Sequence, residues 1–189
     1  RLACRCMMLR WWHTLKDWRL AWVLVIFVCL QSALMALTTP PGYAPDEAAH
    51  MAYIKDSAGS RLLLPDYVDG KLPDGRPNYL GHPPLYYASL GLLAKVGRWE
   101  GPRAQTAMRL ASAALMMLGL VFAVLAARRI GVGQAYAAMA LLACAATPMF
   151  SYQAGSVSND TLLYLGVNMM FYGMACRVTP ADRPREGLP

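Results

Sequence analysis

The sequence predicts an all-α integral membrane protein with about four transmembrane helices, and composition and apolar patterning support this class. Of the 189 residues, 57% are hydrophobic and 15% are charged. A soluble domain usually carries about a quarter charged residues. Four apolar stretches are each long enough, or nearly so, to cross the hydrocarbon core of a bilayer. The predicted spans are residues 20–37, 110–127, 136–152 and 161–178.

The net charge of +7 does not indicate a nucleic-acid partner. Basic residues flank the apolar spans instead of forming a stripe interleaved with aromatic residues. Residues 1–19 are basic and contain three tryptophans, which suits the headgroup layer of a membrane. The 128–129 turn consists of two arginines, and the tail 179–189, which is predicted to be disordered, contains Arg183 and Arg185. Because cytoplasmic loops carry the excess of Lys and Arg, four spans place these three segments in the cytoplasm.

The first apolar span is Leu20 to Leu37, interrupted only by Gln31 and Ser32. A cleaved signal peptide is the alternative, because a basic start precedes the apolar run. No small-x-small cleavage site follows, and further spans do, so a membrane anchor is favoured. The third span contains Pro148, which is predicted to kink it near its end.

Residues 39–108 form a long polar segment on the predicted extracytoplasmic side, too rich in proline, tyrosine and apolar residues for a flexible linker. One short helix is predicted at 46–58, with Asp46, His50 and Tyr53 on one face. A second is predicted at 82–95, and its apolar, tyrosine-rich surface is typical of a helix lying along a membrane. The prediction is therefore two short interfacial helices between spans one and two.

The acidic pair Asp46-Glu47 is the first candidate for chemistry. Carboxylates are unfavourable near lipid, so a pair at the end of a span indicates a functional site. The alternative is structural, because acidic residues in a first turn interact favourably with the helix dipole. For Asn159-Asp160, at the start of the fourth span, helix capping is favoured over catalysis.

Metal binding is a weaker hypothesis for the same residues. A zinc-protease helix reads His-Glu-x-x-His, and Asp46 stands where its first histidine would be. Glu47-x-x-His50 matches half of a di-iron helix pair, but the chain has no second copy of that motif. No cofactor is predicted with certainty. A divalent metal shared by Asp46, Glu47, His50 and Asp160 stays open.

Arg109 and the string His82-Pro-Pro-Leu-Tyr-Tyr87 complete the candidate site. Arg109 opens the second span, where it either anchors the helix end or binds a phosphate through a bidentate hydrogen bond. The string itself is compatible with a helix start followed by interfacial tyrosines.

In combination, these motifs resemble the GT-C superfamily of membrane glycosyltransferases. The motifs are Pro-Asp-Glu-x-x-His at 45–50, His-Pro-Pro-Leu-Tyr-Tyr at 82–87, an Arg-led span and the turn Ser-Asn-Asp at 158–160. The chain is most similar to bacterial members related to protein O-mannosyltransferases and to the aminoarabinose transferase that modifies lipid A. The resemblance covers residues 20–178. Family members are larger, so the chain resembles the N-terminal part of such an enzyme.

The resemblance implies an inverting sugar transfer at the outer face of a bacterial inner membrane. The donor would be a polyprenyl-phosphate-linked sugar, and the acceptor a hydroxyl of a lipid, a glycan or a protein. Asp46 would be the general base, and Glu47 and His50 would orient it or contact the acceptor. The other expected substrate-binding residues are His82, Tyr86, Tyr87, Arg109 and Asp160.

A cation facing the leaving phosphate is needed for this chemistry, and Arg109 is the first candidate. Lys55, Arg61 and Arg103 are the alternatives. The competing hypothesis is a non-catalytic scaffold subunit or an inactive fragment of such an enzyme. A transporter ranks last, because no ionisable residue lies in the middle of a predicted span.

Overall fold

The computed structural model describes residues 18–44, 46–64 and 82–179, and these residues form helices, with no strand among them. Parts of the predicted N-terminal segment and tail, residues 1–17 and 180–189, lie outside this range. The helices are α2 Arg19–Thr38, α3 Glu47–Gly59, α4 Leu85–Gly97, α5 Gly101–Arg129, α6 Gln134–Ala146, α7 Pro148–Ala154 and α8 Asp160–Val178.

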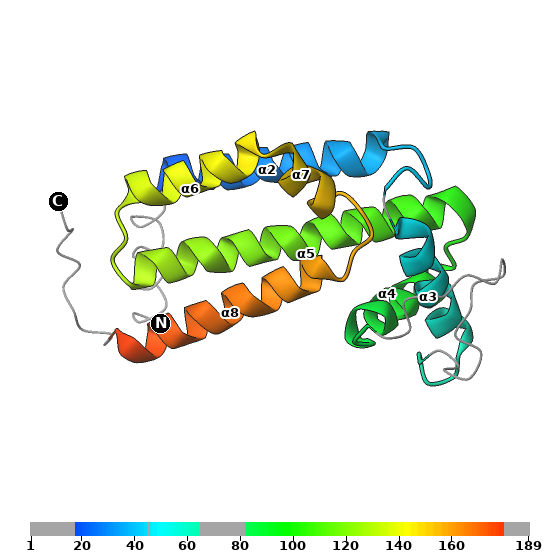
Figure 1. Ribbon diagram of the computed structural model, residues 1–189. Helices are drawn as coiled ribbons and strands as arrows, with labels where there is room; N and C mark the ends of the chain where they lie inside the picture. Colours follow the sequence, from blue (N-terminus) through cyan, green and yellow to red (C-terminus); the bar gives the residue numbers. More distant parts are fainter. Residues whose placement is uncertain (1–17, 45, 65–81, 180–189) are drawn as a thin grey trace, which may run out of the picture.

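α2, α5, α6 and α8 run alongside one another as an elongated bundle (Figure 1). α5 lies between α8 on one side and the α2–α6 pair on the other, and α3 and α4 gather at the end where α5 begins (Figure 1). One buried apolar cluster joins α2, α5 and α6, and includes Val25, Leu120 and Leu141. A second joins α3, α4, α5 and the α7–α8 connection, and includes Tyr53, Tyr87 and Met108. The second cluster fixes the short helices against the bundle.

Within the described residues, two helices are long and apolar enough to cross a membrane: α2, with 20 residues, and α5, with 29. A bilayer core of about 30 Å needs about 20 helical residues. The outer face of α2 exposes large apolar side chains, an arrangement that is unfavourable in water and favourable in lipid. These are Leu20, Val23, Ile26, Phe27, Leu30, Leu34 and Leu37. The chain thus has the features of a membrane protein.

The predicted third span is broken in the structure. α6 ends at Ala146, α7 begins at Pro148, and the two helices are bent by 78° from one another. Proline lacks the amide hydrogen that would continue the helix, and its ring clashes with the preceding turn. The pair counts as a third candidate only if both pieces belong to one span. α8 does not count as a candidate span by length and composition, and it carries Asp160, Asn168 and Arg177. Four spans therefore stay a prediction.

α5 begins at Gly101, well before the predicted start of its apolar run at residue 110. Pro102 lies in its first turn, where a missing amide hydrogen costs nothing. The polar residues 101–109 extend the helix beyond the apolar segment. This extension carries Arg109 on a rigid helix against α3, and so positions the candidate site.

Gly155 allows the end of α7 to approach α2 closely. A Cβ at this position would lie 2.7 Å from the carbonyl oxygen of Ser32 and 2.9 Å from the amide nitrogen of Ala36. Both are backbone atoms of a helix, so they cannot rotate away. We expect Gly155→Ala to destabilise the protein by about 1–3 kcal/mol. Thermal unfolding of the detergent-solubilised protein measures this loss.

Gly166 provides the matched control, because a Cβ built there has no neighbouring atom within 4 Å. Alanine is favoured over glycine inside a helix by about 1 kcal/mol. Gly166→Ala should therefore leave the melting temperature unchanged or raise it. Equal melting temperatures for the two variants would show that α7 does not approach α2 in this way.

Candidate functional site at one end of the bundle

α3 and α4, which carry several residues singled out in the sequence, lie at one end of the bundle (Figure 1). Hydrogen bonds join Glu47 to Arg109, His50 to Tyr87 and His82 to Asn159. α2 ends there, α5 begins there, and the 155–159 connection between α7 and α8 lies nearby. Segments far apart in the sequence therefore supply one site.

The centre of this site is an ion pair between Glu47 and Arg109. Their side chains are 0% and 3% exposed. Arg109 Nε donates to Glu47 Oε1 at 2.7 Å, and Nη2 donates to Oε2 at 2.6 Å. This bidentate geometry is the strongest arrangement available to an arginine and a carboxylate. It joins the first turn of α3 to the first half of α5.

Two further donors complete the environment of the Glu47 carboxylate. Gln105 Nε2 donates to Oε2 at 2.7 Å, and the backbone amide of Val157 donates to Oε1 at 3.2 Å. Each carboxylate oxygen thus accepts two hydrogen bonds. Buried charges are tolerated when they are paired and hydrogen-bonded in this manner.

The Arg109 guanidinium also donates hydrogen bonds to backbone carbonyl oxygens at the end of α2. Nη1 donates to the carbonyl oxygens of Ala36 and Thr39, and Nη2 donates to the carbonyl oxygen of Pro40 at 3.1 Å. These carbonyls belong to the last turn of α2 and the residues that follow. The sequence suggests Arg109 as the cation that faces a leaving phosphate. In the structure, its guanidinium instead binds Glu47 and the end of α2.

Asp46 has a different environment from Glu47, although the two are adjacent. It precedes α3, is exposed, and has φ 58° and ψ −3°, in the left-handed region. Its side chain makes no capping hydrogen bond, and the structural alternative, a favourable interaction with the helix dipole, requires none. Its carbonyl oxygen accepts from the amides of Ala49 and His50. Asp adopts left-handed geometry at some cost, and such strain is concentrated at functional sites.

His50 is buried one turn into α3 and contacts α4. Its Nδ1 and the Tyr87 hydroxyl are hydrogen-bonded at 2.8 Å. The Tyr87 ring stacks on Tyr53, with 3.8 Å between centroids. Tyr86 is also buried, with its hydroxyl 2.7 Å from Ser112 Oγ, and burial raises the pKa of Tyr86. Tyr86 and Tyr87, which the sequence suggests as substrate-binding residues, thus lie in the core between α3, α4 and α5.

His82 and the start of α8 extend the site. The ring centroids of His82 and His50 are 6.0 Å apart, and the Asn159 amide lies 3.1 Å from His82 Nδ1. Asp160 is exposed, and its Oδ2 accepts from Gln153 Nε2 at 2.9 Å. Asn159 occupies the N-cap position of α8, as predicted, but its side chain makes no capping hydrogen bond. Its amide instead links α8 to His82.

The pKa of His50 is lowered, first by burial and second by the nearby His82, while Asp46, Asp160 and Glu47 act in the opposite direction. The folded protein therefore binds a proton at His50 less readily than the unfolded chain does. Folding stability is full above the unfolded pKa of about 6.5 and falls as the pH drops below it.

We expect His50→Gln to remove part of this acid sensitivity, because Gln has no proton to gain. The measurement compares melting temperatures of the wild type and the variant between about pH 7.5 and pH 5. On acidification, the melting temperature of the wild type should fall by more than that of the variant. Parallel loss in both proteins would mean that His50 is not the titrating group.

Metal binding finds no support among the described residues, where no group of three or more His, Cys, Asp or Glu side chains is placed to hold an ion. Asp46, Glu47, His50 and Asp160 are all described, and they do not form such a group. Glu47 is held by Arg109 and Gln105 instead.

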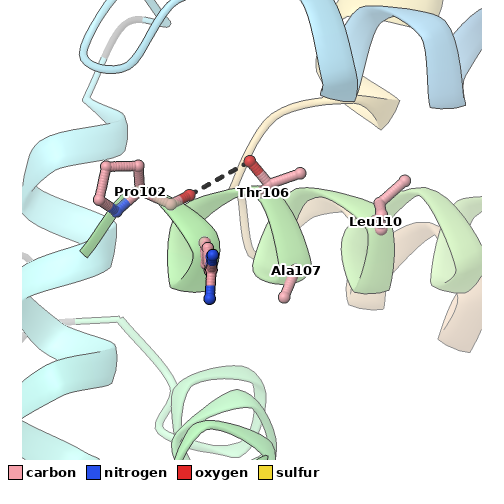
Figure 2. Close-up of a pocket in the computed structure, with 5 residues that line it drawn as sticks. Pro102, Thr106, Ala107 and Leu110 are labelled. Atoms are coloured by element: carbon pink, nitrogen blue, oxygen red, sulfur yellow. Dashed lines mark hydrogen bonds between the residues drawn. The ribbon is translucent and has the colours of Figure 1, made fainter. Parts of the chain in front are cut away.

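A shallow depression of about 370 Å³ lies on the first turns of α5 (Figure 2). Its lining is apolar except for Arg103 and Thr106, and the Thr106 hydroxyl donates to the Pro102 carbonyl at 3.2 Å. Arg103 is exposed, in contrast to Arg109, as are Lys55 and Arg61. The lining residues are Pro102, Arg103, Thr106, Ala107 and Leu110.

Sequence reasoning missed Gln105 and the amide of Val157, which complete the Glu47 site. Gln105 precedes Arg109 by one helical turn and so lies on the same face of α5. That spacing is the signal that could have identified it. The Val157 amide carries no sequence signal at all. Comparison of the chain with protein-family models, curated proteins and solved structures found no match.

Proposed function

We propose that this chain is the N-terminal catalytic part of a membrane glycosyltransferase. It transfers a sugar from a polyprenyl-phosphate-linked donor to an acceptor hydroxyl, inverts the anomeric carbon, and uses Asp46 as the general base. The acceptor belongs to a lipid, a glycan or a protein. The membrane is the bacterial inner membrane, and the site is on its extracytoplasmic side.

One observation carries this proposal: the two adjacent carboxylates have opposite environments. Glu47 is buried and bonded on both oxygens, so it serves as a positioning residue. Asp46 is exposed at the end of two apolar helices, and its side chain makes no capping hydrogen bond. A base must reach solvent or substrate to accept a proton, and Asp46 meets that requirement.

The proposed reaction assigns one role to Asp46 and one to Arg103. Asp46 accepts the proton of the acceptor hydroxyl. The hydroxyl oxygen forms a bond to the anomeric carbon of the sugar, and the bond from that carbon to the phosphate oxygen breaks. A positioned carboxylate contributes a factor of about 10²–10⁴ to such a step. The leaving phosphate needs a cation. Because Arg109 is committed to Glu47, we assign that role to the exposed Arg103, at the start of α5.

The proposed topology has four spans and a cytoplasmic N-terminus, with α8 and the bent α6–α7 pair as the additional spans. α3 and α4 lie at the membrane surface. Four arginines at helix ends support this orientation by the positive-inside rule. They are Arg19 at the start of α2, Arg128 and Arg129 at the end of α5, and Arg177 at the end of α8.

The test is sugar transfer by the full-length protein in membranes supplied with radiolabelled polyprenyl-phosphate sugar. Asp46→Asn should stop transfer without reducing the amount of membrane-inserted protein. Glu100→Gln, which neutralises another exposed carboxylate just before α5, should transfer normally. Normal transfer by Asp46→Asn would remove the enzyme proposal and favour the scaffold alternative.

A further inference from the structure

α4 has two faces with different environments. Tyr86, Tyr87 and Leu90 are buried, and Gly91 packs so closely on α3 that a Cβ would lie 3.1 Å from the Ala58 amide nitrogen. The opposite face exposes large apolar side chains. They are Leu85 at 66%, Leu92 at 48%, Leu93 at 44% and Val96 at 75% exposed. Because α3 fixes the rotation of α4, this apolar face points permanently away from the protein.

The C-terminal end of α4 adds a tryptophan that is held in place. Arg98 ends the helix in the left-handed region at φ 50°, and the Trp99 amide donates to the Ala94 carbonyl at 3.1 Å. The Trp99 indole covers Gly97, where a Cβ would lie 2.5 Å from the ring. Trp99 remains 39% exposed. An amphipathic ring anchored beside apolar residues is typical of the membrane–water interface.

Basic side chains border the same face. Residues 95–103 contain Lys95, Arg98 and Arg103 against the single acid Glu100, which gives 3 − 1 = +2. Lys95 Nζ donates to the Ser60 carbonyl at 3.4 Å, and an ammonium group has three donors in all. Arg98 is exposed. The surface therefore combines apolar side chains, a tryptophan and a positive edge.

The position of this surface identifies what covers it. α5, one of the two helices that could span a membrane, begins at Gly101, just after Trp99. The Tyr86 hydroxyl on α4 lies 2.7 Å from Ser112 Oγ, within the apolar run of α5 that begins at residue 110, so α4 packs at the level where α5 enters the lipid. A symmetric contact with a second copy would bring two positive edges together, which is unfavourable. Anionic lipid headgroups match the charge, and acyl chains match the leucines.

We propose that this α4 surface, formed by Leu92, Leu93, Lys95, Val96, Arg98 and Trp99, binds anionic phospholipid at the bilayer surface. The aliphatic side chains enter the acyl boundary, and Lys95 and Arg98 pair with headgroup phosphates. The long basic side chains reach the headgroups while their stems stay in the apolar layer. This role is independent of the transferase proposal, because it requires no turnover.

The first test locates Val96 in the membrane. A bimane label at Val96→Cys, in a cysteine-free protein that retains the wild-type melting temperature, is reconstituted in bilayers containing brominated lipid. The control label is at Lys55→Cys, exposed on α3. The label at position 96 should be quenched by bromolipid and shielded from aqueous acrylamide. The label at position 55 should be quenched by acrylamide and not by bromolipid. Quenching by acrylamide alone, or by neither reagent, would overturn the proposal, since the surface would face water or another protein copy.

The second test measures the preference for anionic lipid. Protein with native cysteines is placed in phosphatidylcholine nanodiscs containing increasing phosphatidylglycerol, and bound anionic lipid is counted by native mass spectrometry. Lys95→Gln and Arg98→Gln should each weaken the apparent affinity about fivefold. Glu100→Gln, which removes the neighbouring negative charge, should strengthen it. Equal binding by the wild type and the two neutralised variants would overturn the anionic preference.

Discussion

Glu47→Gln should destabilise the folded protein by about 3–5 kcal/mol, because it leaves the Arg109 guanidinium buried beside a neutral side chain. Arg109→Met should destabilise the protein by a similar amount, because it leaves the Glu47 carboxylate buried without its cation. These losses are comparable to the whole stability of many domains, so we expect low yields and a large fall in melting temperature. Thermal unfolding of the detergent-solubilised proteins measures both effects.

A double-mutant cycle separates the ion pair from other damage. Glu47→Gln combined with Arg109→Met removes both charges, so the double variant should lose less stability than the sum of the two single losses. Recovery should be incomplete, because the carbonyls of Thr39 and Pro40 lose their partners. Single variants that melt like the wild type would contradict the described pairing.

Glu100→Gln is the matched control for the stability series. It removes one carboxylate from the start of the same helix that carries Arg109, but this carboxylate is exposed. Surface substitutions of this kind usually change stability by less than about 0.5 kcal/mol. A fall in melting temperature as large as that of Glu47→Gln would show that net charge, and not the buried pair, controls stability.

Asp46→Asn should lower sugar transfer by about 10²–10⁴-fold while the melting temperature stays at the wild-type value. Asparagine is close to aspartate in shape and also tolerates the left-handed backbone that residue 46 adopts. The substitution therefore removes the base and keeps the geometry. The measurements are initial transfer rates and thermal unfolding on the same preparation.

Asp46→Ala provides a second variant, because it removes the carboxylate but accepts the left-handed backbone less readily. Its rate of sugar transfer should fall as much as that of Asp46→Asn, and its melting temperature should also fall. Full transfer by either variant would exclude Asp46 as the base. Loss of folding in Asp46→Asn would instead indicate a structural role for this carboxylate.

Hydrophobic patterning and helix-end signals predict the local structure well in this chain. The first span is predicted at 20–37 and is Arg19–Thr38 in the structure, and the helix predicted at 46–58 is Glu47–Gly59. Glycine and proline mark such ends because each restricts the backbone in a known way. Pro148 predicts a kink, but not the 78° break that ends α6. How far a chain turns at a proline depends on packing, here on the approach of Gly155 to α2.

The candidate site could be predicted only in part. Local patterns identify the acidic pair and Arg109, but Glu47 and Arg109 are 62 positions apart, and Glu47 and Val157 are 110 apart. Helix periodicity carries no information about such distant pairs. Tyr86 and Tyr87 are expected from the sequence to bind substrate, but both are buried in the structure. A tyrosine-rich helix face suits a protein core as well as a membrane surface, so the sequence alone does not distinguish the two.

The most direct measurement for the central claim is the structure of the full-length protein with an unreactive polyprenyl-phosphate sugar analogue and an acceptor. The account predicts an Asp46 carboxylate oxygen within about 2.6–3.2 Å of the acceptor oxygen. It also predicts that Glu47 remains bonded to Arg109, with Arg103 on the phosphate. A sugar bound elsewhere, with Asp46 still facing water, would contradict the assignment of Asp46 as the base.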